Sequence, residues 1–160
     1  MNKNVKTTAL MAVIIWFAFI LNCYANGDNE FICIAKTEFI IGGISCEFSK
    51  EQVIAVKGKP NNITINKDLN LEVLKYPDMD IQISNNNILY LVTSMAKNKT
   101  PSGISTGMKK SDVMKILGFD NYSDKRSIFQ FVNCEYEFYM VFTFDKNDIL
   151  TSLGMGIDLP

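Results

Sequence analysis

Few side chains in this 160-residue sequence could carry out chemistry. The sequence has no histidine, which removes the most common general base and a frequent metal ligand. Ser-His-Asp and Cys-His nucleophilic sites are therefore excluded. The four cysteines, Cys23, Cys33, Cys46 and Cys134, have spacings that match no zinc pattern. We therefore expect a protein that is not an enzyme, with no catalytic residues, no metal and no cofactor.

Two carboxylate pairs, Asp78/Asp80 and Asp145/Asp148, remain as possible acid–base or cation sites. Both lie where turns are expected, and aspartate is favoured in turns because it hydrogen-bonds to nearby backbone. A calcium site at residues 145–148 would need more oxygen ligands than the segment supplies. The sequence therefore favours turns at both pairs.

Aromatic side chains point instead to binding. Tyrosine is enriched at recognition surfaces because it offers a large rigid area with a polar tip. We predict a protein-binding face of a β-sheet, and its candidate residues are Tyr76, Tyr90, Phe131, Tyr136 and Tyr139. The alternative is that these rings are core residues or ordinary cross-strand pairs.

The N-terminus has the pattern of a secretory signal peptide, predicted over residues 1–25. Lys3 and Lys6 precede an uncharged apolar run at residues 9–21, which is short for a transmembrane helix. Ala25 is a small residue suited to cleavage. An uncleaved anchor is one alternative. Lipidation of Cys23 is another, although Asn22 replaces the small residue that this modification normally requires.

Cleavage after Ala25 would leave 14 basic and 17 acidic side chains, a formal charge of −3. A mildly acidic chain argues against a nucleic-acid partner. We expect a periplasmic or secreted protein that contacts a membrane only if Cys23 carries a lipid. Export would also permit disulfides. We predict a Cys33–Cys46 bond because the loop is short; pairing with Cys134, or three buried thiols, are the alternatives.

An internal repeat organises the rest of the chain. Residues 43–58, GISCEFSKEQVIAVKG, match residues 103–118, GISTGMKKSDVMKILG, at an offset of 60. Residues 80–89 similarly match residues 141–150 with one inserted residue. We place repeat 1 at residues 26–98 and repeat 2 at residues 99–160, within one compact domain.

Each repeat reads as a helix followed by strands. Ser49 and Gln52 form a capping box, and Gly58 ends the first helix. Lys109 or Lys110 begins the second helix with a poorer cap, and Gly118 ends it. The apolar runs at residues 31–35 and 39–41 are too short to assign to strand or helix.

Alternating and β-branched residues predict strands over residues 63–65, 69–76, 79–84, 88–94, 127–132, 135–144 and 149–157. Asn85, Asn86 and Asn87 suit a tight hairpin turn because asparagine tolerates left-handed backbone angles. In residues 135–144 the even positions predict a core face. The predicted fold class is α+β: two tandem helix-plus-antiparallel-meander repeats that share one sheet, with the helices on one face.

The repeated motif resembles the unit of the beta-lactamase inhibitory protein family and is similar to the SmpA/OmlA outer-membrane lipoproteins. The matching residues are Gly43, Ile44, Phe48, Lys50, Val53, Gly58 and Pro60, and again Gly103, Ile104, Met108, Lys110, Val113 and Gly118. The resemblance implies exported, non-enzymatic proteins that bind another protein across the sheet. The second copy lacks the Gly-x-Pro of the first.

From these features we expect an exported protein-binding protein, such as an enzyme inhibitor or an immunity protein that neutralises a toxin. The alternatives are an envelope assembly or structural factor, favoured by a lipid on Cys23, and a small-molecule carrier, which would need a closed apolar pocket.

Overall fold

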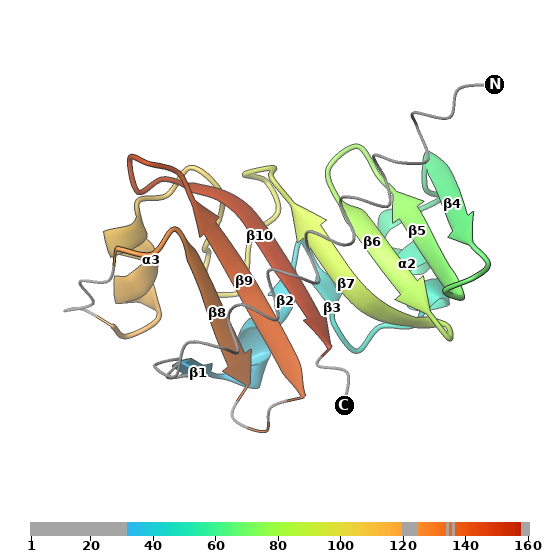
Figure 1. The fold of residues 1–160 in the computed structure, drawn as a ribbon, viewed down its shortest axis with the longest axis horizontal. Coiled ribbons are helices and arrows are strands. Elements are labelled where there is room, and N and C mark those ends of the chain that lie inside the picture. Colours follow the sequence, from blue (N-terminus) through green and yellow to red (C-terminus); the bar gives the residue numbers. More distant parts are fainter. Residues whose placement is uncertain (1–31, 120–124, 134, 136, 158–160) are drawn as a thin grey trace. The chain divides into compact units, whose positions relative to one another are not determined.

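A computed structural model describes residues 32–119, 125–133, 135 and 137–157 (Figure 1). All of them belong to the second of the two units into which the chain divides, Ile32–Pro160. The strands are β1 Ile32–Ile34, β2 Ile40–Ile41, β3 Ile44–Ser45, β4 Asn62–Asn66, β5 Leu71–Lys75, β6 Asp80–Ser84, β7 Asn87–Thr93, β8 Ile128–Asn133, β9 Phe138–Phe144 and β10 Leu150–Ile157. The helices are the 3₁₀ turn η1 Lys36–Glu38 and the α-helices α2 Lys50–Lys57 and α3 Lys110–Ile116.

Eight of these strands form one sheet in the order β1-β8-β9-β10-β7-β6-β5-β4. All neighbours are antiparallel except β1, which lies parallel to β8. The pairing of β10 with β7 joins the meander β8-β9-β10 to the meander β7-β6-β5-β4 (Figure 1). Strands β2 and β3 form a separate two-stranded hairpin.

The predicted α+β class is wrong, because the described part of the chain is mostly β. It has ten strands, eight of them in one mixed sheet, and two α-helices of only eight and seven residues. Helices this short cannot form a layer over eight strands. The hairpin residues Ile41 and Ile44 and the loop residue Ile104 pack into the core beside them and are fully buried.

The two α-helices begin and end where the sequence predicts. Ser49 Oγ accepts a hydrogen bond from Gln52 N, and the Gln52 side chain accepts one from Ser49 N, which completes the capping box of α2. Gly58 ends α2 with φ of 79°. The N-cap of α3, Lys109, makes no side-chain capping bond. Within the described ranges, no helix is long and apolar enough to cross a membrane.

Both helices attach to a strand turn by the same kind of bond. Lys50 N donates to Asn86 O at the β6–β7 turn, and Lys110 N donates to Asp148 O at the β9–β10 turn. Asn85, Asn86 and Asp148 all have positive φ, so these turns use the residue types that tolerate left-handed backbone. The predicted asparagine hairpin is confirmed.

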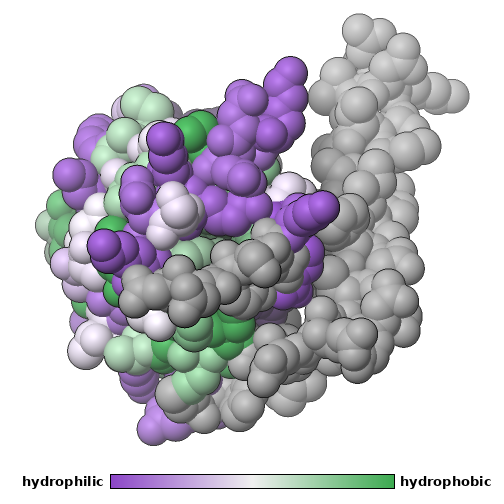
Figure 2. All heavy atoms as spheres, turned by 90° about the vertical axis from the view of Figure 1, so that its left-hand side faces the viewer, coloured by the Kyte–Doolittle hydropathy of each residue, from purple (hydrophilic) through white to green (hydrophobic). Residues whose placement is uncertain are grey.

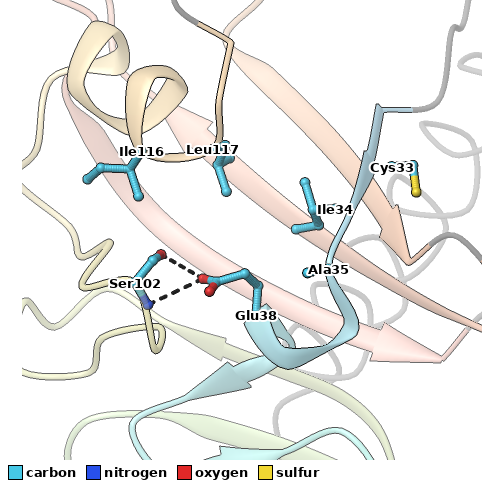
Figure 3. A pocket seen from close by; sticks show the side chains of 7 residues that line it. All are labelled: Cys33, Ile34, Ala35, Glu38, Ser102, Ile116 and Leu117. Carbon is cyan, nitrogen blue, oxygen red and sulfur yellow. Dashed lines mark hydrogen bonds between the residues drawn. The ribbon is translucent and has the colours of Figure 1, made fainter.

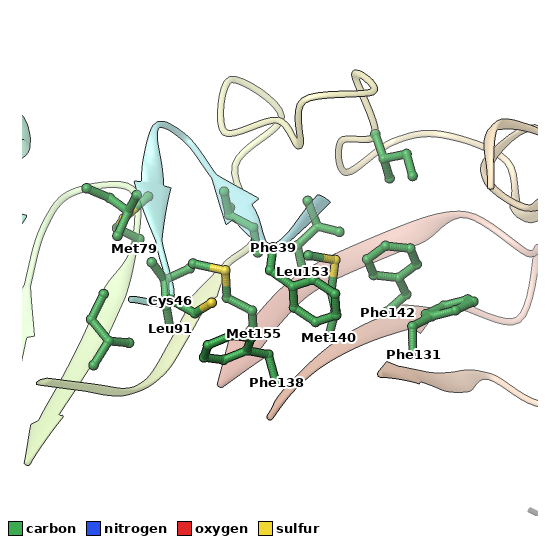
Figure 4. Packing of buried hydrophobic residues seen from close by; sticks show 14 of the residues in the cluster. Phe39, Cys46, Met79, Leu91, Phe131, Phe138, Met140, Phe142, Leu153 and Met155 are labelled. Carbon is green, nitrogen blue, oxygen red and sulfur yellow. The ribbon is translucent and has the colours of Figure 1, made fainter. Parts of the chain in front are cut away.

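The core lies on one face of the sheet, here called the inner face. In β9 the even residues Phe138, Met140, Phe142 and Phe144 are buried while the odd residues are half-buried, as the alternation predicts. Figure 4 shows aromatic, Leu and Met side chains of β8, β9 and β10 packed together with Phe39 of the hairpin segment. The buried helix residues Val53, Val113 and Met114 belong to the same cluster.

The predicted Cys33–Cys46 disulfide is wrong. Cys46 is a free thiol, 3% exposed, in the core cluster that also contains Leu91 and Met155 (Figure 4). Cys33 lies in β1 and is disulfide-bonded, but not to Cys46. Cys33 does not bond to Cys46 because it lies in β1, whose residues pair with β8 residues 99 positions further along the sequence.

Candidate protein-binding site

The second sheet face, here called the outer face, carries the residues that alternate with the core. Strand register aligns them in two rows, since residues directly opposite one another share a face. One row runs Val132, Tyr139, Gly156, Tyr90, Gln82, Val73 and Thr64. The next runs Gln130, Val141, Gly154, Val92, Asp80, Lys75 and Asn62.

Two tyrosines and two glycines form the centre of this face. The rings of Tyr90 and Tyr139 stack with centroids 6.2 Å apart and an interplanar angle of 20°. Tyr90 comes from β7 and Tyr139 from β9, so the pair bridges β10, which lies between them. The Tyr90 hydroxyl lies over Gly154, and the hydroxyl end of Tyr139 lies over Gly156. We call Tyr90, Tyr139, Gly154 and Gly156 the tyrosine platform.

The glycines make this arrangement possible. A β-carbon on Gly156 would lie 2.7 Å from Leu89 O and 2.8 Å from the Tyr139 ring, and one on Gly154 would overlap the Tyr90 hydroxyl. Glycine inside a strand often marks such a close approach. The hydroxyl ends of both rings therefore occupy space over the β10 backbone that side chains at these positions would otherwise fill.

The two rings of the platform are buried to different extents. Tyr90 is 7% exposed, and burial together with the neighbouring Tyr139 raises the pKa of its hydroxyl far above the usual value. Tyr139 is half-buried, as are Val92 and Val141 beside it. The Tyr90 hydroxyl thus stays neutral at physiological pH, and the platform is an apolar surface with polar tips.

The five predicted binding residues are not brought together. Tyr90 and Tyr139 meet on the outer face, but Phe131 is fully buried in the core on the inner face. Tyr76 is also in the core, and its hydroxyl donates to Gly58 O at 3.0 Å. The prediction of an exposed position is wrong for Phe131, Tyr76 and Tyr90, which are all buried, although Tyr90 does lie on the outer face. Tyr136 lies outside the described residues.

Sequence reasoning missed Gly154 and Gly156. The sequence does contain a signal for them. Two glycines separated by one residue in a predicted strand lie on the same face, and they leave two neighbouring positions of that face without side chains. Reading that spacing with the alternation of β9 would have placed Tyr139 next to a side-chain-free stretch of backbone.

A pocket of about 290 Å³ lies at another place, between β1, η1 and the C-terminal end of α3. It is lined by Cys33, Ile34, Ala35, Glu38, Ser102, Ile116 and Leu117 (Figure 3). The Glu38 carboxylate accepts hydrogen bonds from Ser102 Oγ at 2.6 Å and Ser102 N at 3.4 Å. Around this end of the molecule, Figure 2 shows polar residues between separate apolar patches.

Three of the four aspartates in the two carboxylate pairs lie in turns. Asp145 Oδ1 accepts from Asn147 N and Ile149 N, and these bonds lower the pKa of Asp145. Asp78 pairs with Lys57 and Lys97 in the β5–β6 turn. The prediction of turns is confirmed for Asp78, Asp145 and Asp148 but is wrong for Asp80, which is the first residue of strand β6. The described residues contain no group of three or more His, Cys, Asp or Glu side chains that could hold a metal.

Comparisons with known proteins show what the fold resembles. No family model and no curated protein matches the chain. An extracellular protein containing an SCP domain from Bacillus anthracis matches with a TM-score of 0.51 and 15% identity, over 83% of this chain and 49% of that chain. A cysteine-rich secretory protein from Staphylococcus aureus matches with a TM-score of 0.50 and 12% identity, over 81% of this chain and 51% of that chain.

A DUF4309 family protein from Bacillus subtilis matches with a TM-score of 0.39 and 10% identity, over 69% of this chain and 78% of that chain. The chain spans about half the length of the first two proteins. At this identity the similarity shows a shared fold and nothing about activity. The fold is therefore one that also occurs in proteins described as extracellular or secretory.

Proposed function

We propose that this chain is an exported, non-catalytic protein that binds another protein through the outer face of its sheet, centred on the tyrosine platform. The action of such a protein is inhibition of an exported enzyme or neutralisation of a toxin. One ground for the proposal is that residues 43–58 and 103–118 resemble the repeated motif of the beta-lactamase inhibitory protein family, whose members bind another protein across a sheet.

The tyrosine platform is the observation that carries this proposal. The Tyr90 and Tyr139 rings stack, and their hydroxyl ends pack over Gly154 and Gly156, so binding would restrict few additional rotamers. Rigid aromatic surfaces of this kind are frequent energetic centres of protein interfaces. The surrounding polar residues of the two rows, such as Gln82 and Gln130, would supply the hydrogen-bonding rim.

Export is supported by the pattern of residues 1–25 and by the extracellular and secretory proteins that share the fold. The mass of the purified chain, expressed at full length in its producing cell, tests this part directly. A product that begins at Asn26 supports the proposal. A product that begins at a lipidated Cys23 would instead indicate a membrane-anchored envelope factor.

Binding is tested by capture from the extracellular and envelope fractions of the producing cell. The full chain, the variant Tyr139→Ala and the control Val56→Ala are immobilised, and bound proteins are quantified by mass spectrometry. Val56 is a matched control because it is an exposed apolar residue, 53% exposed, on α2. We expect a stoichiometric partner that is at least tenfold depleted by Tyr139→Ala and retained by Val56→Ala and Tyr139→Phe. Equal capture by a correctly folded Tyr139→Ala would overturn the proposal.

A further inference from the structure

Among the residues that the structure describes, strand β4 has a neighbour on one side only and forms an open edge of the large sheet. It pairs with β5 on one side and is the last strand in the sheet order (Figure 1). All five of its residues, Asn62–Asn66, are exposed. In an antiparallel strand, alternate residues direct their backbone N–H and C=O groups away from the neighbouring strand. An open edge therefore offers hydrogen bonds to another extended strand.

This edge lacks the features that usually prevent strand addition. Residues 62–66 read NITIN, without a charge, a proline or a glycine. Ile63 and Ile65 are 43% and 61% exposed, although Ile63 lies opposite Leu74, which is fully buried. The inner face thus continues to the edge as exposed isoleucine, a residue type with high strand propensity.

The edge is also self-complementary, because NITIN reads the same in both directions. An antiparallel pairing of two copies centred on Thr64 places Asn62 of one copy opposite Asn66 of the other, and Ile63 opposite Ile65. The pairing brings four isoleucines together on one face and only Asn and Thr side chains on the other. A twofold interface requires this property, that the same residues meet from both copies.

We propose that two copies of this chain associate edge to edge through β4, antiparallel and centred on Thr64, to form one continuous sheet. The twofold axis is perpendicular to the sheet, so the two outer faces lie on the same side of the pair. The inference does not rest on the proposed function, since β4 and the tyrosine platform are separate parts of the sheet.

The test uses charge at the twofold axis. Thr64 is the one residue that faces itself, so Thr64→Lys and Thr64→Glu each place like charges directly opposite one another. Sedimentation of the purified full chain should give twice the monomer mass, and either variant alone should give the monomer mass. An equimolar mixture of the two variants should restore the doubled mass, which also shows that both are folded. Thr151→Lys, the same change at an exposed residue of β10, is the matched control and should stay dimeric.

Cysteine substitution tests the register. Thr64→Cys should form a disulfide between copies under mild oxidation, whereas Asn62→Cys should do so only with Asn66→Cys. Monomer mass for the unmodified chain up to millimolar concentration would overturn the proposal. A doubled mass that persists in Thr64→Lys would also overturn it, because the copies would then meet through another surface.

Discussion

The rings of Tyr90 and Tyr139 stack 6.2 Å apart across a strand that belongs to neither of them. The contact is possible because β10 has Gly154 and Gly156 on this face. The platform is therefore set by three strands at once, and the two glycines affect it as directly as the two tyrosines do.

Replacement of Gly154 by alanine tests this dependence. The three nearest atoms to an added methyl group all belong to the Tyr90 side chain. We expect Gly154→Ala to lower the free energy of unfolding by about 1–3 kcal/mol, the usual cost of overpacking. In a Tyr90→Leu background the same change should cost less than about 0.5 kcal/mol, because Leu lacks the ring atoms that meet the methyl group. Urea unfolding of the four proteins measures the coupling.

Gly156 is the control for that cycle. The nearest atom to its added methyl group is the backbone oxygen Leu89 O, at 2.7 Å. Removing the ring with Tyr139→Leu should therefore leave the cost of Gly156→Ala largely unchanged. Equal rescue at both glycines would contradict the assignment of the two contacts.

The sequence predicted local elements well because their signals are local. Alternation in β9, the Ser49 capping box and the asparagine turn each depend on residues a few positions apart. The fold class was wrong in part because the short run near Ile32 becomes a strand only through a distant partner. Strand β1 exists by pairing with β8, which local periodicity does not encode.

The site was predicted in part for a related reason. Alternate positions along a strand lie on the same face of the sheet, so spacing shows which residues share a face. Spacing does not show which of the two faces packs against the core. Phe129 and Phe131 do share a face, as their spacing indicates, and that face is the inner one. The outward-facing position of Tyr139 was predicted correctly, because core residues occupy every second position along β9. Tyr90 and Tyr139 become a pair only through the β7–β10–β9 order.

The unequal caps of the two helices lead to opposite predictions. Ser49→Ala removes the hydroxyl that accepts from Gln52 N and should lower the free energy of unfolding by about 1 kcal/mol. Lys109 holds the equivalent N-cap position of α3 with extended backbone, φ −71° and ψ 145°, and without a capping bond. Lys109→Ser should therefore raise stability by about 0.5–1 kcal/mol. Thermal unfolding of both variants, with Lys109→Ala as control, distinguishes a new cap from simple loss of charge.

The lowered pKa of Asp78 predicts that acid destabilises the β5–β6 turn. Burial alone would raise the pKa of its carboxyl group, but hydrogen bonds from Lys57 and Lys97 outweigh burial and lower the pKa. A carboxyl group with a lowered folded pKa stabilises the protein above its unfolded pKa of about 4 and loses that contribution as the pH falls through the folded pKa. We expect unfolding free energy to decrease below about pH 4, and less steeply in Asp78→Asn.

The two lysines around Asp78 should contribute unequally. The Lys57 side chain is 15% exposed with Nζ 2.8 Å from Asp78 Oδ2, whereas the Lys97 side chain is 65% exposed at 3.1 Å. Lys57→Met should cost about 1–3 kcal/mol, since it leaves a buried carboxylate poorly paired. Lys97→Met should cost less than about 1 kcal/mol, as exposed ion pairs do. Similar costs in denaturant unfolding would contradict this ranking.

Cys46 should be a thiol that reacts only when the chain unfolds. Burial, and to a smaller extent the charge of Glu47, raise the pKa of Cys46 to about 11. Because the thiolate is the reactive form, a rise of about two pKa units lowers its population near pH 8 roughly 100-fold, and burial slows access further. Native protein treated with an aromatic disulfide reagent should leave Cys46 unmodified for hours, and denatured protein should react within minutes, as peptide mapping would show.

The same shift predicts a loss of stability in alkali. With the folded pKa above the unfolded value, the unfolded chain releases the Cys46 proton first, so stability falls as the pH rises from about 9 to about 11. Other groups titrate in this range, so the informative quantity is the difference between the native chain and Cys46→Ala. That difference should shrink as the pH rises. Rapid labelling of the native protein, or a difference independent of pH, would show that Cys46 is accessible to solvent and that the core around Leu91 and Met155 is open.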